Sequence, residues 1–300
     1  MTPLSDIIDQ HGLNKHYFAD DSDLYLTFKP SPGQPQNTVS SLESCVGDVN
    51  IWMKQNKLKL NGDKTELMIY HHPRKSLENC EMIVDGSPVV PAKSASNLGI
   101  RYDTSLQFVQ HVSRVVQSAS HQLRNIGHIR QFLTTDAAKT LIQAMVTSRL
   151  DYGNSLLAGL PDSQIQRLQK VQNCAARIIT FTKRHEHITP VLEHLHWLPV
   201  KYRIEHNVLT HTYKALHNEA PSYISDLVQK YTPSRSLRSE NQLLLQTPRT
   251  HTCTYGDRSF SAIAPTLWNN LPNNIRTAGS VTSFKRCLKT YYFRIAFNVT

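Results

Sequence analysis

Two adjacent carboxylates, those of Asp20 and Asp21, are the side chains of this sequence best suited to chemistry. A run over residues 15–18 that ends in the aromatic pair Tyr17-Phe18 leads into them, and polar and large apolar residues alternate over residues 22–28. Acids are rare inside strands and common in turns, so this pattern predicts a β-hairpin with the two acids at its tip. Carboxylates held at such a turn can bind a hard divalent cation such as Mg²⁺. A solvated turn whose acids bind nothing fits the same residues.

The box Phe18-Ala19-Asp20-Asp21, set between two strand-like runs, resembles the Phe/Tyr-Ala-Asp-Asp active-site box of reverse transcriptases. Two later segments resemble parts of the same enzymes, in the same order. Residues 58–65 are similar to the palm sequence Leu-Lys-Leu-Asn-x-x-Lys-Thr, and residues 98–103 are similar to the Leu-Gly-x-x-x-Asp hairpin called the primer grip. With further likenesses downstream, residues 17–297 resemble the jockey-like LINE group of non-LTR retrotransposons.

The resemblance implies an RNA-directed DNA polymerase, a nucleotidyltransferase that uses Mg²⁺. Asp20 and Asp21 match the family's catalytic, metal-binding carboxylates. Lys59 and Lys64 match its two palm lysines, one of which acts near the triphosphate. The resemblance does not say which, and solvated lysines beside a turn explain both equally well. Gly99 matches the glycine of the primer grip, where a missing side chain allows close approach to the backbone.

The resemblance also implies that part of the polymerase is absent from this sequence. Such enzymes bind two Mg²⁺ ions, and their palms hold these ions with carboxylates from two separate strands. Only 17 residues precede Phe18, and Asp6 and Asp9 among them do not resemble the family's first carboxylate strand. We therefore expect the chain to be a truncated reverse transcriptase without the fingers and the first half of the palm, binding Mg²⁺ weakly and inactive alone. The alternatives are a nucleic-acid-binding module and a retrotransposon remnant without function.

The spacing of apolar residues predicts an α+β fold. Residues 1–14 are expected to be irregular or weakly helical. The hairpin, a strand over 67–70 and a strand over 96–103 with Gly99 at its centre are expected to form a partial palm sheet. Pro30, Pro32, Gly33 and Pro35 predict a loop over 29–37. Helical spacing predicts a series of helices, over residues 38–55, 106–132, 136–150, 163–182 and 202–217, and a final amphipathic segment.

By resemblance, the chain divides into three regions. Residues 1–105 correspond to a partial palm, residues 106–184 to a helical, thumb-like region, and residues 185–300 to a helical C-terminal extension. These boundaries follow the order of the matching segments and the change from strand-like to helical spacing near residue 105.

The helix expected over residues 163–182 has two distinct sides. Its apolar residues fall within one arc at 100° per residue, whereas Arg167, Lys170 and Arg177 fall together on another side. A helix with one packed face and one cationic face suits a position along a nucleic-acid backbone. A surface helix with solvated basic residues has the same pattern.

The charge is unevenly distributed along the chain. Residues 1–100 contain 9 Lys and Arg against 12 Asp and Glu, whereas residues 101–300 contain 24 against 11. A strongly basic region beside an acidic one is compatible with an RNA or DNA backbone as partner, although charge alone also fits a basic chain that is simply solvated.

Other features of the sequence narrow the class of protein. No run of 18 apolar residues and no N-terminal signal pattern are present, so we expect no membrane partner. Five widely spaced cysteines without a Cys-x-x-Cys pair favour a reduced, intracellular location, nuclear or cytoplasmic. Two His-x-His pairs, at 185–187 and 194–196, could bind zinc if brought together. The core-like residues around the second pair favour a structural role instead.

Overall fold

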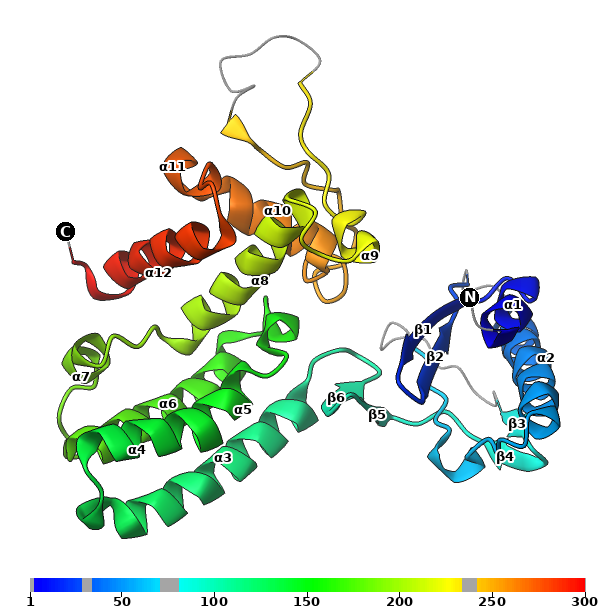
Figure 1. The fold of residues 1–300 in the computed structure, drawn as a ribbon, viewed down its shortest axis with the longest axis horizontal. Helices are drawn as coiled ribbons and strands as arrows, with labels where there is room; N and C mark the ends of the chain where they lie inside the picture. Colours follow the sequence, from blue (N-terminus) through cyan, green and yellow to red (C-terminus); the bar gives the residue numbers. More distant parts are fainter. Residues whose placement is uncertain (1–2, 29–33, 71–80, 234–241, 300) are drawn as a thin grey trace. The chain divides into compact units, whose positions relative to one another are not determined.

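The computed structural model describes residues 3–28, 34–70, 81–233 and 242–299. The chain forms two compact units, Met1–Ser105 and Leu106–Thr300. The described part of the first unit consists of small antiparallel sheets and helices, and helices dominate the described part of the second (Figure 1). The predicted α+β fold class is confirmed.

In its described residues, the first unit has the α-helices α1 and α2 and three separate two-stranded sheets, rather than the single small sheet that was predicted. Each sheet is a hairpin of consecutive antiparallel strands, paired β1-β2, β3-β4 and β5-β6. In chain order the elements are α1 (Pro3–Gln10), β1 (Asn14–Phe18), β2 (Asp21–Tyr25), α2 (Gln34–Gln55), β3 (Met82–Val84), β4 (Ser87–Val89), β5 (Ser94–Asn97) and β6 (Ile100–Asp103).

Helix α1 corrects the expectation that residues 1–14 would be irregular or weakly helical. Its apolar side chains point to one side, and Ile8 is buried against Leu13 and against Cys45 and Val49 of α2. Packing of this one face stabilises a helix that is too short to be stable by itself. The helix predicted from residue 38 begins at Gln34 and ends, as predicted, at Gln55.

The strand predicted over residues 67–70 is also wrong. Leu67 forms a single parallel bridge to Pro91, and no longer ladder follows. A proline has no backbone N–H to donate, which limits pairing at this point. Leu67 is buried with Val39 of α2 and with Met82 and Val84 of β3, so its apolar side chain still belongs to the core.

The second unit is a series of helices. The predicted helices appear as α3 (Val109–Ile129), α4 (Thr135–Ile142), α5 (Ser148–Asp151), α6 (Asp162–Thr180) and α8 (Val200–Leu216). The helix predicted over 136–150 is interrupted by a π-helical segment, Gln143–Thr147. The remaining helices are α7 (Thr189–His194), α9 (Ser222–Ser225), α10 (Phe260–Asn269), α11 (Asn273–Arg276) and α12 (Val281–Phe297).

Two groups of helices share this unit, and α8 contacts both. Helices α3, α4 and α6 pack side by side, in green in Figure 1, with Val112, Ile142 and Leu168 fully buried among them. Helices α8, α10 and α12 enclose a second core around Trp268 and Phe284, whose rings stack with centroids 5.7 Å apart. Residues 106–184 and 185–300 therefore lie within one compact unit.

Candidate metal-binding hairpin and cationic helix surfaces

The predicted hairpin with acids at its tip is confirmed. Strands β1 and β2 pair in the register Phe18 to Asp21, which leaves Ala19 and Asp20 as a two-residue turn. Ala19 has φ +55°, in the left-handed region that its Cβ disfavours by about 1 kcal/mol. The sequence Phe-Ala-Asp-Asp thus places Asp20 in the turn and Asp21 on the first position of β2.

The tip carboxylates do not form a complete metal centre within the described residues. Asp20 and Asp21 are both exposed. In the described ranges, no group of three or more His, Cys, Asp or Glu side chains lies close enough to hold a metal ion. The next acid on the hairpin, Asp23, accepts a hydrogen bond from Asn97 Nδ2 at 2.6 Å. Mg²⁺ prefers six oxygen ligands in near-octahedral array, so these two residues alone do not fit a two-metal site.

The two palm-like lysines lie beside a capped turn. Asn61 caps the 3₁₀ turn Gly62–Lys64, because its Oδ1 accepts from Lys64 N at 3.3 Å and its carbonyl oxygen accepts from Thr65 Oγ1 at 3.0 Å. The side chains of Lys59 and Lys64 are exposed. Among the interactions of the described residues, no hydrogen bond or ion pair joins either lysine to Asp20 or Asp21.

Gly99 lies in a turn and not in the centre of a strand, which corrects the prediction over residues 96–103. Leu98 and Gly99 connect β5 to β6 with φ of +46° and +79°. Two consecutive residues in the left-handed region are the signature of a type I′ hairpin turn, and glycine suits the second position because it has no Cβ. The Asn97–Asp23 hydrogen bond joins this hairpin to the one that carries the acids.

The three cations of α6 have different surroundings. Arg177 donates from Nη1 to the carbonyl oxygen of Lys183 at 2.5 Å and from Nη2 to that of Glu186 at 2.8 Å, so it holds the loop that follows the helix. Arg167 donates to Ser113 Oγ of α3 at 2.8 Å. Lys170 is exposed. The structure therefore leaves Lys170 and part of the Arg167 guanidinium available on this side of α6.

Other arginines of the second unit also donate hydrogen bonds to backbone carbonyl groups. Arg130 is buried and donates to the carbonyl oxygens of Leu133, Ile178 and Ile179. Arg276 is buried and donates to the carbonyl oxygens of Gln242, Asn269 and Leu271. Their charges count toward the basic total of residues 101–300 but are not displayed on the surface.

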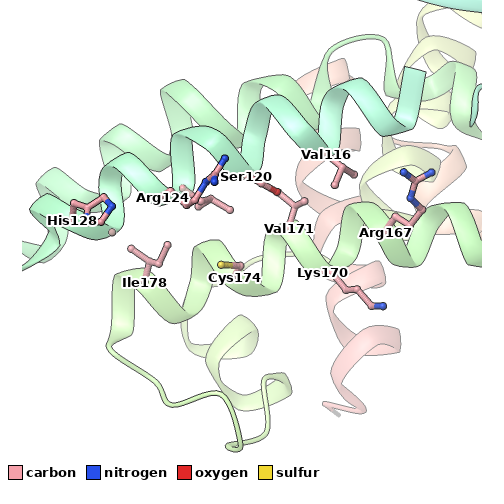
Figure 2. Close-up of a pocket in the computed structure, with 11 residues that line it drawn as sticks. Val116, Ser120, Arg124, His128, Arg167, Lys170, Val171, Cys174 and Ile178 are labelled. Atoms are coloured by element: carbon pink, nitrogen blue, oxygen red, sulfur yellow. The ribbon is translucent and has the colours of Figure 1, made fainter. Parts of the chain in front are cut away.

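Two surfaces of the second unit each carry several cations, and other exposed cations, such as Lys183 and Lys230, lie elsewhere on the unit. One surface is a groove of about 610 Å³ between α3 and α6, which Figure 2 shows with its lining side chains. Its cations are Arg124, Arg167 and Lys170. The other is α12, where Lys285, Arg286, Lys289 and Arg294 are exposed.

Sequence reasoning did not identify the α12 cations as a site. The signal was nevertheless present, because no Asp or Glu occurs anywhere in residues 258–300. In the described part of that stretch, Arg276 is buried and Arg258 donates to the carbonyl oxygens of Ala158 and Leu106. The exposed charge of the stretch thus lies on α12.

The histidine pairs at 185–187 and 194–196 form no metal site among the described residues. His196 instead lies against Phe293 of α12, with ring centroids 5.5 Å apart. Leu192 between the pairs is buried.

Comparison of the chain with family models, curated proteins and solved structures gave no match. The likeness to reverse transcriptases therefore stays a prediction made from the sequence segments. No helix among the described residues is both long enough and apolar enough to cross a bilayer.

Proposed function

We propose that this chain is a reverse-transcriptase-type polypeptide that binds the phosphate backbone of RNA or DNA and does not polymerise by itself. The observation that supports this proposal is the set of exposed cations on α12. Four exposed cations lie on one helix, and none of them takes part in an ion pair among the described residues. Lys and Arg side chains free of acidic partners are the groups that replace counterions on a nucleic-acid backbone.

Salt dependence tests the binding. We expect a labelled single-stranded RNA to lose affinity steeply between about 50 and 200 mM salt, with a slope in the double-logarithmic plot of about −0.7 per phosphate contacted. The double variant Lys285→Gln/Lys289→Gln should reduce the slope by about 1.4, since two contacts are removed. The control Lys183→Gln/Lys230→Gln removes the same charge from exposed lysines elsewhere in the unit. Equal effects of the two double variants, or no binding at low salt, contradict the proposal.

The incomplete ligand set at the hairpin tip supports the second part of the proposal. Two exposed carboxylates supply at most a few of the oxygens that Mg²⁺ requires, and the described residues bring no third acid to them. Two-metal chemistry needs ions held about 3.5–4 Å apart by fixed ligands. We infer that Asp20 and Asp21 bind Mg²⁺ weakly in this chain.

A primer-extension assay tests this inference. The purified chain is incubated with an RNA template, a DNA primer, deoxynucleotides and Mg²⁺, beside the double variant Asp20→Asn/Asp21→Asn. We expect no extension from either protein, and isothermal titration should detect little difference in Mg²⁺ binding between them. Extension that disappears in the double variant shows a functional metal centre and refutes the inference.

A further inference from the structure

The groove between α3 and α6 has an apolar floor and a cationic rim. Val116, Leu123, Val171 and Ile178 form the floor, and Leu123 and Val171 are buried at its base. Figure 2 shows Val171 and Cys174 on the side of α6 that faces α3. We call this feature the α3–α6 groove.

The two helices run in the same direction along the groove. Ser113 contacts Arg167 at one end, and the Cβ position of Gly127 lies 4.0 Å from Ile178 Cδ1 at the other. The lining residues extend from Val116 to His128 on α3 and from Arg167 to Ile178 on α6. At 1.5 Å per residue, these stretches are about 16–18 Å long, which is the length of a helix of about three turns.

The charged side chains along the rim of the groove determine which ligand charge is favoured. Arg124 and Lys170 are exposed, Arg167 lies at one end, and none of the lining residues is acidic. A guanidinium has five donors, and the Arg167 group uses its Nη1 and Nη2 atoms for Gln164 and Ser113, which leaves capacity for a carboxylate. The rim therefore favours an anionic ligand.

The floor distinguishes an acidic helix from a nucleic acid. Phosphate contacts need donors or water, whereas the floor offers aliphatic side chains that gain free energy only against another apolar surface. We propose that the α3–α6 groove binds an acidic amphipathic helix of a partner protein, with apolar side chains at i, i+4 and i+7 on the floor and Glu or Asp against the cationic rim. This partner goes beyond nucleic-acid binding through α12.

A synthetic peptide provides the probe. It is a fluorescein-labelled, helix-forming peptide of about 14 residues, with three Leu at i, i+4 and i+7 and flanking Glu. A second peptide carries Lys in place of each Glu. Fluorescence anisotropy with the full chain should show binding of the Glu peptide only. Lys170→Glu should weaken the Glu peptide about fivefold and strengthen the Lys peptide, since the sign of one rim charge is reversed.

Gly127→Leu tests the location of the site. The backbone of Gly127 is helical and its Cβ position has only ordinary contact with Ile178, so a side chain there enters the groove without backbone strain. We expect Gly127→Leu to weaken the Glu peptide about tenfold, because it occupies space needed by one apolar anchor. Gly47→Leu on α2 is the matched control, since Gly47 is also helical and nothing lies within 4 Å of its Cβ position.

Cys174 gives a readout that does not depend on substitution of the groove. In the variant Cys80→Ser/Cys253→Ser/Cys287→Ser, Cys174 remains as the exposed thiol of the described chain. The thiol can be reached from solvent, but the groove around it removes part of its hydration and so raises its pKa; maleimide labelling is therefore measured at mildly alkaline pH. The Glu peptide should slow the labelling of Cys174 about tenfold, and the Lys peptide should not.

Three results overturn the proposal. The first is equal binding of the Glu and Lys peptides, and the second is unchanged binding by Gly127→Leu. The third is loss of single-stranded RNA binding in Gly127→Leu, which would make the groove a nucleic-acid site. If Gly127→Leu does not fold, Lys170→Glu and the labelling of Cys174 still decide the question.

Discussion

Arg203 of α8 and Asp151 at the end of α5 form a two-point ion pair. Arg203 Nε donates to Asp151 Oδ1 at 2.9 Å, and Nη2 donates to Oδ2. Asp151 also accepts from Asn154, which in turn accepts from Asn207 of α8. The pair is part of a polar network that joins the end of α5 and the turn after it to α8, so this arginine is a structural residue.

Replacing the guanidinium group of Arg203 should therefore reduce the stability of the protein. We expect Arg203→Lys to lower the free energy of unfolding by about 1–2 kcal/mol, because an ammonium cannot make the two parallel hydrogen bonds. Urea denaturation followed by circular dichroism measures the change. Arg286→Lys on α12 is the control, because Arg286 is exposed and outside the described ion pairs. A loss as large in Arg286→Lys would contradict the structural role.

Substitution of Arg130 should lower the free energy of unfolding more than substitution of Arg203. It is buried and satisfies three carbonyl oxygens, two of them at the C-terminal end of α6, and its guanidinium carbon lies 4.2 Å from the centroid of the Phe181 ring. Arg130→Met leaves these carbonyls without a donor, and we expect a loss of about 3 kcal/mol. A loss below about 1 kcal/mol in thermal or urea unfolding would show that water replaces the guanidinium.

Replacing Ala19 by glycine should stabilise the tip of the β1–β2 hairpin. Ala19→Gly removes the Cβ from a residue at φ +55°, and we expect a gain of about 0.5–1 kcal/mol for the first unit. Ala95→Gly in β5 is the control. Ala95 is outside the left-handed region, so glycine there should destabilise. Hydrogen exchange of the β1 and β2 amides locates the effect, and faster exchange in Ala19→Gly would contradict it.

Stability should depend on pH through Glu205. Burial raises the pKa of the Glu205 carboxyl above its ordinary value of 4.5, and a hydrogen bond from the Tyr292 hydroxyl lowers it in part. The folded chain therefore holds this proton more tightly than the unfolded chain. The contribution to stability is full below pH 4.5 and is lost as the pH rises through the folded-state pKa.

Glu205→Gln removes this dependence. The variant should melt at the same temperature as the unmodified protein at about pH 4 and at a higher temperature at about pH 7.5. Glu219→Gln, at an exposed site, should change neither melting temperature. A stability difference that grows toward low pH would have the wrong sign and would exclude the buried carboxyl as its cause.

Local signals in the sequence predicted much of the fold. The alternation around Asp20 and Asp21 predicted the hairpin, and the spacing of apolar residues predicted α3, α6 and α8. Helix α1 was missed because its stability comes from packing on α2. Gly99 was placed in a strand because the two strands that it separates, Ser94–Asn97 and Ile100–Asp103, are only 4 residues long each.

The candidate sites were harder to predict because they depend on partners far away in the sequence. Arg177 and Lys170 are on the same helix side by spacing, yet only the structure shows that Arg177 is used by the loop that follows. Arg258 donates to the carbonyl oxygen of Leu106, 152 residues away. A count of basic residues cannot separate these arginines from the exposed cations of α12 and the α3–α6 groove.

The β1–β2 hairpin has a practical consequence for work with this protein. It is a two-stranded ribbon that no other described strand extends, and Tyr17, Phe18 and Tyr25 are exposed on it. Ribbons with open edges and aromatic surfaces self-associate through strand pairing. We expect aggregation at high concentration to begin here, and a lysine placed along an outer edge should increase soluble yield without altering either helical core.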